Sequence, residues 1–356
     1  MNFDLTEDRQ MLSDSLNRFL ADRYGWEERT RVAYTAPFSD AGLWAAMAEL
    51  GIPGALVPEA QGGFGGSGFD IAVVFEALGR ALCPEPLLPA LLASRLLGAA
   101  GEDQSGLIDG SVRHAVGLSE IDAPYDWAGM GMTARARGAG HVLSGRKTAV
   151  YGAQVADVLL VAAMLDGRPA VFRLDAGAAS VISYGMIDGG GAAEVLLDDT
   201  PATLLLADAQ SALEDAVKAG RIALCAEAVG AMGRAFDLLL DYLKTRRQFG
   251  THIGSFQALQ HRTVDLLTEI EQSRSIVIAA AAVMDEAEGG LKAAMAKNLI
   301  GRAARLVAEE TVQMHGGIGM TWEYAGSHYA KRLVMLDHQL GDTDHCLEAV
   351  MTSYAA

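Results

Sequence analysis

Two polar, glycine-containing segments hold the side chains best suited to bind a phosphorylated ligand. Arg246, Gln248 and Phe249 stand close together, and Gln313 with Gly316-Gly317 follows about one helix-bundle length later. A guanidinium can grip a pyrophosphate through two hydrogen bonds, and an amide can bind an adenine or phosphate edge. Taken alone, Arg246 also fits a solvated cation that the helix dipole favours at a helix end. The ordered pair of segments favours a dinucleotide site.

Long helices are the elements that must position these segments. Apolar side chains recur every three or four residues over 213–242, which predicts a helix that runs into the first segment. Gly250 interrupts this pattern, and two further apolar stripes follow at 256–270 and 291–314. The last stripe ends at 315–319, where glycines suit a helix C-cap and leave backbone amides open to a ligand. These stripes predict most of a helical bundle.

The hydrophobic period changes twice along the chain. Helical periodicity covers the first part, and short apolar runs bounded by glycine turns then predict strands joined by hairpins. The strand-like runs lie at 115–118, 132–136, 141–143, 158–163, 170–174 and 194–197. We predict a mainly α fold with a central β domain: a helical domain at 1–110, a β-barrel or sandwich at 111–205 and a four-helix bundle at 206–356.

Composition narrows the function classes. The chain has 356 residues, 51% of them hydrophobic, and a formal net charge of -17, which argues against nucleic acid as a partner because phosphates need a basic face. Three scattered cysteines without CxxC spacing predict neither a disulfide framework nor a metal site. No apolar run is long enough for a signal peptide or a membrane span, so we expect a cytoplasmic protein that does not bind a membrane.

The two segments together resemble a known family signature. Arg246-x-Gln248-Phe249-Gly250, followed by Gln313-x-x-Gly316-Gly317-x-Gly319, is similar to that of the acyl-CoA dehydrogenases. The stretch 242–260 is closest to the small subunits of two-subunit members such as pimeloyl-CoA dehydrogenase. The resemblance implies the family's three-domain architecture, FAD, α,β-desaturation of an acyl-CoA thioester and electron-transfer flavoprotein as acceptor. It also implies a dimer of dimers, either a homo-oligomer or a heterotetramer with a larger acyl-CoA dehydrogenase subunit.

The resemblance also assigns roles to individual residues. Those that it places against the FAD of a neighbouring subunit are Arg246, Gln248, Phe249, Gln313, Gly316 and Gly317. Ser119 stands where a hydroxyl usually bonds the flavin ring, and Arg221 stands at a substrate contact. Ala149 and Tyr151 depart from the family pattern, because an aromatic residue and a threonine usually contact the flavin there.

Both positions from which the family takes its catalytic base lack a carboxylate. The usual Glu-Gly-Thr falls on Leu340-Gly341-Asp342, and the alternative position, one residue before Arg221, is Gly220. Leucine cannot accept the α-proton that this chemistry removes. Asp342 is the nearest substitute base, with Asp337 as the second choice. Either aspartate fits a surface residue near a helix end equally well.

Three hypotheses follow. The first is an acyl-CoA dehydrogenase-like enzyme that works alone, as a homo-oligomer or as the small subunit of a heteromer. The second is a non-catalytic accessory subunit that shares FAD with a catalytic partner and stabilises it; the missing glutamate favours this one. The third, a helical scaffold without a ligand, leaves the ordered motif pair unexplained. A formal GxGxxG at 63–68 is set aside because no strand leads directly into it.

Overall fold

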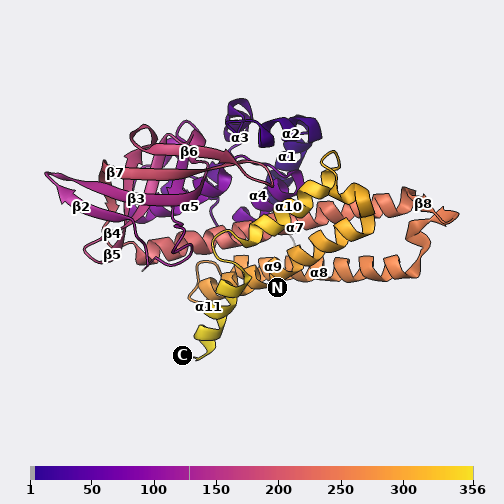
Figure 1. Cartoon of the computed structure of the whole chain (residues 1–356). Coiled ribbons are helices and arrows are strands. Elements are labelled where there is room, and N and C mark those ends of the chain that lie inside the picture. Colours follow the sequence, from indigo (N-terminus) through magenta and orange to yellow (C-terminus); the bar gives the residue numbers. More distant parts are fainter. Residues whose placement is uncertain (1–4, 128, 356) are drawn as a thin grey trace. The chain divides into compact units, whose positions relative to one another are not determined.

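The computed structural model describes residues 5–127 and 129–355. Helices α1 to α6 precede the strands β1 to β7, and helices α7 to α11 follow them (Figure 1). The predicted fold class, mainly α with a central β domain, is therefore confirmed. The chain divides into two compact units, and each unit combines segments that are far apart in the sequence. The domain boundaries near residues 110 and 205 stay a prediction.

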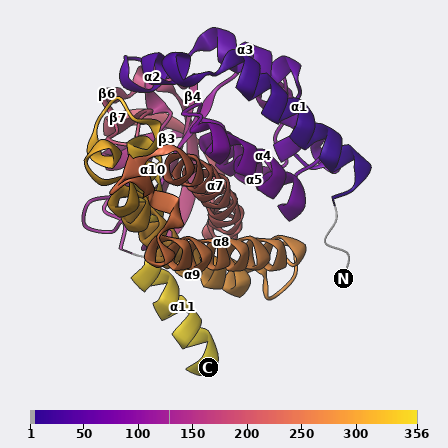
Figure 2. The ribbon, with the colours of Figure 1, turned by 90° about the vertical axis from the view of Figure 1, so that its right-hand side faces the viewer.

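The first unit is helical and consists of Met1–Arg29, Gly68–Cys83 and Arg221–Ala356. Its helices are α1 (Glu7–Arg23), α4 (Gly68–Ala81), α8 (Gln257–Ala282), α9 (Gly289–His315), α10 (Ala325–Asp337) and α11 (Thr343–Ala355), with most of α7 (Gln210–Thr245). Helices α8, α10 and α11 pack on α9, and α8 lies beside α9 in both views (Figures 1 and 2). No helix in the described ranges is long and apolar enough to cross a membrane.

Two helices from the N-terminal part of the sequence belong to this same unit. Helix α4 packs on α1 and α8, and it approaches α7 closely through two glycines. A Cβ on Gly79 would collide with the backbone of α7, and a Cβ on Gly230 would collide with the backbone of α4. The predicted N-terminal helices thus help to build the core around the C-terminal ones, which periodicity alone does not reveal.

The second unit consists of Thr30–Ser67 and Pro84–Gly220 and contains the sheet. Helix α2 (Trp26–Tyr34) enters this unit, which also holds α3 (Ala41–Glu49), α5 (Leu87–Ala100) and α6 (Ser105–Ile108). The strands are β1 (His114–Gly117), β2 (Thr133–Arg137), β3 (Gly140–Tyr151), β4 (Val158–Leu165), β5 (Arg168–Asp175), β6 (Ser180–Gly185) and β7 (Gly191–Leu206).

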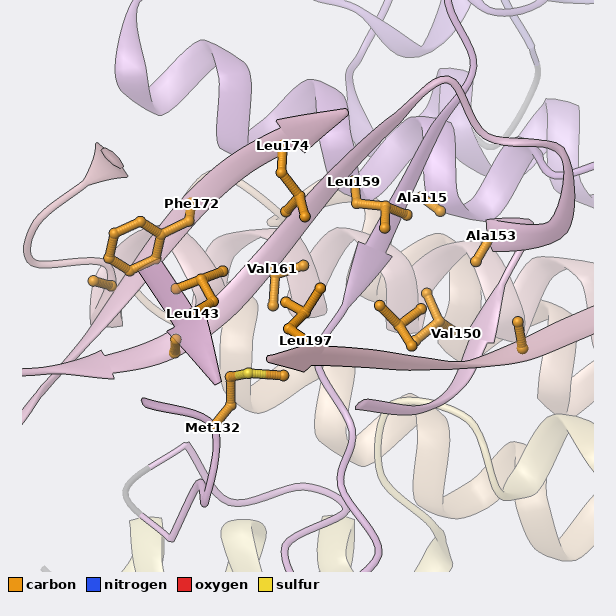
Figure 3. Packing of buried hydrophobic residues seen from close by; sticks show 14 residues of the cluster. Ala115, Met132, Leu143, Val150, Ala153, Leu159, Val161, Phe172, Leu174 and Leu197 are labelled. Atoms are coloured by element: carbon orange, nitrogen blue, oxygen red, sulfur yellow. The ribbon is translucent and has the colours of Figure 1, made fainter. Parts of the chain in front are cut away.

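The sheet closes into a small barrel. Its strand order is β1-β4-β2-β3-β7-β5, and β5 also pairs with β4, which closes a ring of β4, β2, β3, β7 and β5. Strand β1 pairs with β4 and strand β6 pairs with β7 at the margin of this ring. The predicted hairpins β2–β3 and β4–β5 form, whereas the short parallel pair β1–β4 was not predicted. Alternate side chains of these strands, Leu143, Val161 and Phe172 among them, point into one buried cluster (Figure 3). This cluster is the core that holds the barrel together.

Candidate functional site

The first predicted segment forms an exposed hairpin after α7. Strands β8 (Arg247–Gln248) and β9 (Thr251–His252) pair through a two-residue turn. Both turn residues are left-handed, with φ of 51° at Phe249 and 81° at Gly250, as a type I′ turn requires. Phe249 is 90% exposed, so the hairpin presents an aromatic ring to its surroundings. An aromatic ring is hydrophobic, so burying it against another surface is favourable, and the tip of the hairpin is suited to such a contact.

Backbone hydrogen bonds hold the base of the hairpin, whereas the guanidinium of Arg246 is free to bind a ligand or another chain. Arg246 N donates to Tyr242 O at 2.8 Å, and Arg246 O accepts from Ile253 N at 2.9 Å. Its guanidinium is exposed and, among the residues that the structure describes, forms no ion pair or side-chain hydrogen bond. The structure therefore offers this charge to a ligand or to another chain.

The second predicted segment is a glycine turn at the end of α9. Gly316 caps the helix with φ 66°, and a short 3₁₀ turn, η6 (Gly316–Met320), follows. A Cβ on Gly316 or Gly317 would meet nothing within 4 Å, so the backbone here is open, and the side chain of Gln313 is exposed as well. An open helix end with bare backbone is the kind of surface that a phosphorylated ligand can approach.

The structure brings the two segments to the same end of the helical unit. The ring of Tyr242, one helical turn before Arg246, lies 4.8 Å from the ring of His315, the last residue of α9. Residues next to the two motifs, Tyr242 and His315, therefore pack directly against each other, although the motifs lie more than sixty residues apart in the sequence.

The turn that carries the usual base position is tightly held but has no acid at its centre. Leu340 lies between α10 and α11 with φ 55°, and its carbonyl accepts a hydrogen bond from Nε of Arg221 at 2.7 Å. A Cβ on Gly341 would lie 2.7 Å from Nη2 of Arg221, so only glycine fits beneath the guanidinium. Asp342 Oδ1 accepts from His345 N at 2.8 Å and thereby caps the start of α11.

Two neighbouring residues of α9, Lys297 and Asn298, hold the two ends of this turn. Lys297, 2% exposed, donates from Nζ to Asp337 O at 2.8 Å. Burial lowers the pKa of Lys297, and nearby Cys225 and Asp337 partly oppose the shift. Asn298 donates to Thr343 O at 2.9 Å, and Thr343 donates to Asp337 Oδ1 at 2.9 Å. Sequence reasoning missed this clamp, although a lysine inside the apolar stripe of α9 signals a buried charge.

The predicted flavin-facing residue Ser119 lies in the second unit, just after β1. The backbone carbonyl of Ser119 accepts a hydrogen bond from Thr148 N at 2.9 Å. This backbone contact does not use the Ser119 hydroxyl. Next to it, Lys147 and Glu120 form a buried ion pair of 2.6 Å, and Lys147 also donates to Leu118 O at 3.1 Å. Burial would raise the pKa of Glu120, but Lys147 together with the backbone amides of Gly131 and Met132 outweighs this effect and lowers it.

Strand β3, which is bonded to Ser119 through Thr148, contains Ala149 and Tyr151, the two residues that depart from the family pattern. Ala149 has φ 48° at an irregularity in the β3–β7 register, between Lys147 and Val150. Tyr151 closes β3 and is half-buried. The backbone there is kinked, and the aromatic side chain that the resemblance leads one to expect at 149 is replaced by a methyl group.

Comparison with known proteins identifies the family of the chain. Residues 6–104 match the family description "Acyl-CoA dehydrogenase, N-terminal domain", and residues 210–348 match "Acyl-CoA dehydrogenase, C-terminal domain". The chain is 32% identical over 350 residues to "Probable acyl-CoA dehydrogenase YngJ" of Bacillus subtilis, covering 91% of this chain and 92% of that protein.

Solved structures share the fold along the whole chain. "Tcur3481-Tcur3483 steroid ACAD G363A variant" is 30% identical with a TM-score of 0.89, and the match covers 98% of each chain. "FAD complex of PigA" is 24% identical with a TM-score of 0.88 and covers 100% of this chain and 99% of that chain, which shows the shared fold. The chain belongs to the acyl-CoA dehydrogenase family of oxidoreductases, which act on CH-CH groups.

Proposed function

We propose that this chain is the small subunit of a heteromeric acyl-CoA dehydrogenase and that its hairpin and glycine turn bind an FAD shared with the partner subunit. The observation that carries the proposal is the guanidinium of Arg246, exposed and without a partner in the described chain. It stands at the same end of the unit as the open backbone of Gly316 and Gly317. A helical protein that bound no anion would gain little from such an arrangement.

The donor set fits the proposed cofactor. Arg246 would hold the pyrophosphate by charge-assisted hydrogen bonds, and Gln248 and Gln313 are amides able to bind an adenine or phosphate edge. Phe249 adds an exposed ring. When bound, FAD supplies the acceptor for the hydride that leaves the β-carbon of an acyl-CoA thioester. The FAD complex of PigA has the same fold and supports the choice of FAD over other dinucleotides.

Two observations support a heteromeric assembly. The 30% identical solved structure is named for two components, Tcur3481 and Tcur3483. In addition, α8 carries exposed apolar side chains, with Val264 61% and Leu267 44% exposed, along a shallow groove that Leu299 of α9 also lines. Apolar stripes of this kind usually lie in interfaces. A homo-oligomer in which copies of this chain share the cofactor is the alternative arrangement.

A second candidate function is an accessory subunit with no chemistry of its own, and Leu340 specifically favours it. The turn around Leu340 keeps its clamps but has no carboxylate where a base would act. In the catalytic alternative, Asp342 acts as the base, Ser119 contacts the flavin, and Arg221 binds the substrate through its Nη groups. The His345 amide engages only Oδ1 of Asp342, so the second carboxylate oxygen would be the one to take the proton.

The wider setting of the proposal follows from the same chemistry. The substrate would be an acyl-CoA, and electron-transfer flavoprotein would reoxidise the cofactor. We place the assembly in the cytoplasm, where a reducing environment suits the free thiols of Cys83, Cys225 and Cys346.

The test is to purify the chain with and without the product of its neighbouring gene and to record flavin absorbance and dye-linked oxidation of acyl-CoAs. Arg246→Ala should weaken FAD binding by about 1.5 to 3 kcal/mol, the cost of a lost charge-assisted contact. Arg302→Ala, which removes an exposed arginine in the middle of α9, is the matched control. Equal flavin retention in both variants would place the cofactor elsewhere and reject the proposal.

A further inference from the structure

The two halves of the proposed FAD surface meet at a single buried imidazole. His315 is the last residue of α9 and is 3% exposed. Its Nδ1 lies 2.7 Å from Thr311 O, and its Nε2 lies 2.7 Å from the hydroxyl of Tyr324. Both ring nitrogens therefore have close polar partners, on α9 and at the start of α10.

These contacts define the tautomer. A carbonyl oxygen only accepts, so Nδ1 must carry the hydrogen that is shared with Thr311 O. Nε2 of the neutral ring is then an acceptor, and the Tyr324 hydroxyl donates to it. Burial lowers the pKa of His315 and so favours the neutral ring, against the opposing effect of the backbone carbonyls of Thr311 and Leu238. The imidazole thus works as a fixed connector between two elements and has no exposed nitrogen left for a ligand.

The connector spans the glycine turn. The bond from Tyr324 to His315 closes the loop that contains η6, with Gly316 and Gly317 on its open side. Gly319 lies on the inner side, where a Cβ would be 2.9 Å from His315 Cβ and 3.1 Å from Val312 O. The glycines therefore differ in purpose: Gly319 makes room for the histidine, whereas Gly316 and Gly317 leave backbone exposed.

The same imidazole also contacts the helix that leads to the hairpin. Tyr242 of α7 packs against it with the two rings inclined by 42°. Tyr242 O in turn accepts from Arg246 N at 2.8 Å. A displacement of His315 would therefore change the position of the glycine turn relative to Arg246.

We propose that His315 and Tyr324 are positioning residues that hold the glycine turn in register with Arg246, without touching the cofactor themselves. This inference rests on the proposed function, because it assigns the two residues to the FAD surface described there. Cofactor contacts made from two separate helices bind well only if their spacing is set before the ligand arrives. Breaking the connector should therefore reduce FAD affinity more than it reduces folding stability.

The experiment compares Tyr324→Phe, which removes only the hydroxyl, with Tyr354→Phe, which removes a hydroxyl from a residue of α11 that is 74% exposed. Each variant is purified as the assembly. Its FAD dissociation constant is measured by flavin fluorescence, and the melting temperature of its apoprotein is measured in parallel. We expect Tyr324→Phe to raise the dissociation constant roughly fivefold, equivalent to one lost hydrogen bond, and Tyr354→Phe to leave it unchanged.

Arg246→Ala separates failure of this inference from failure of the proposed function. If Arg246→Ala weakens FAD binding but Tyr324→Phe lowers only the melting temperature, the positioning role is rejected and the FAD site stands. If neither variant changes FAD binding, the site and the positioning role fall together. Histidine nitrogen NMR gives a readout that does not need FAD: a neutral His315 with its proton on Nδ1 supports the connector, and one protonated on Nε2 overturns it.

Discussion

Replacing Leu340 by glutamate tests whether the turn between α10 and α11 is a complete active-site element that lacks only its base. The backbone at Leu340 already has φ 55°, a conformation that costs a residue with a Cβ about 1 to 2 kcal/mol. Leucine and glutamate both lack a branch at Cβ, so the substitution adds no further backbone strain. The contacts of Arg221 and Lys297 involve backbone carbonyls and persist whatever side chain stands at position 340.

The structure also limits the increase in reaction rate that we expect from Leu340→Glu. A positioned general base contributes ~10² to 10⁴-fold to such a reaction. The guanidinium of Arg221 is bonded to the backbone carbonyl of the same residue, and a positive charge this near would lower the pKa of a new carboxylate. A lower pKa makes a weaker base. We therefore expect a gain nearer ~10² than ~10⁴, with activity that rises with pH and levels off below neutrality.

The assay is reduction of bound flavin by an acyl-CoA in a single turnover, followed by dye-linked steady-state turnover of the same assembly. Leu340→Gln is the control, because it has the size and polarity of glutamate but cannot take up the proton. A gain in Leu340→Glu that Leu340→Gln lacks supports the reasoning. Equal rates in the two variants, with flavin content unchanged, would show that position 340 does not face the reacting carbon, and the argument would fail.

Three further predictions concern the surroundings of the site. Asp342→Asn keeps an N-cap side chain, so stability should stay within about 0.5 kcal/mol of wild type; a fall in turnover of ~10²-fold or more in that variant would identify Asp342 as the base, and unchanged turnover would exclude it. Gly301→Ala puts a Cβ well under 3.0 Å from Thr343 Oγ1 and Asp337 Oδ1. It should cost about 1 to 3 kcal/mol in denaturant unfolding, whereas Gly290→Ala, which meets nothing within 4 Å, should stabilise the same helix by up to about 1 kcal/mol. Burial raises the pKa of Glu85 to about 7 from 4.5, so folding favours its protonated form. Between pH 4.5 and 7 the wild type should lose about 3 kcal/mol of stability that Glu85→Gln does not lose, and parallel stability curves for the two proteins would contradict this.

The elements that the sequence predicts well are those whose burial is regular. The apolar stripe over 213–242 became α7, and the run at 158–163 became β4, because each has a continuous buried face. Strand β6 was missed since its residues alternate irregularly between exposed and half-buried positions. The assignment of α1 and α4 to the C-terminal helical unit was also beyond sequence reasoning, because it depends on close contacts such as that of Gly79 with α7.

The candidate site shows a second kind of limit, which concerns residues that break an apolar pattern. Lys297 and His315 both lie on the buried face of α9, where sequence periodicity alone assigns them no partner. Their partners, Asp337 O and the Tyr324 hydroxyl, come from segments whose approach depends on the three-dimensional fold. A buried charge or imidazole is tolerated only when its hydrogen bonds are satisfied. A polar residue inside an apolar helix stripe therefore already indicates that another segment must meet the helix there. In this chain, the residues so marked hold the turn at Leu340 and the turn at Gly316, the two places from which the proposed chemistry and the proposed cofactor binding would be controlled.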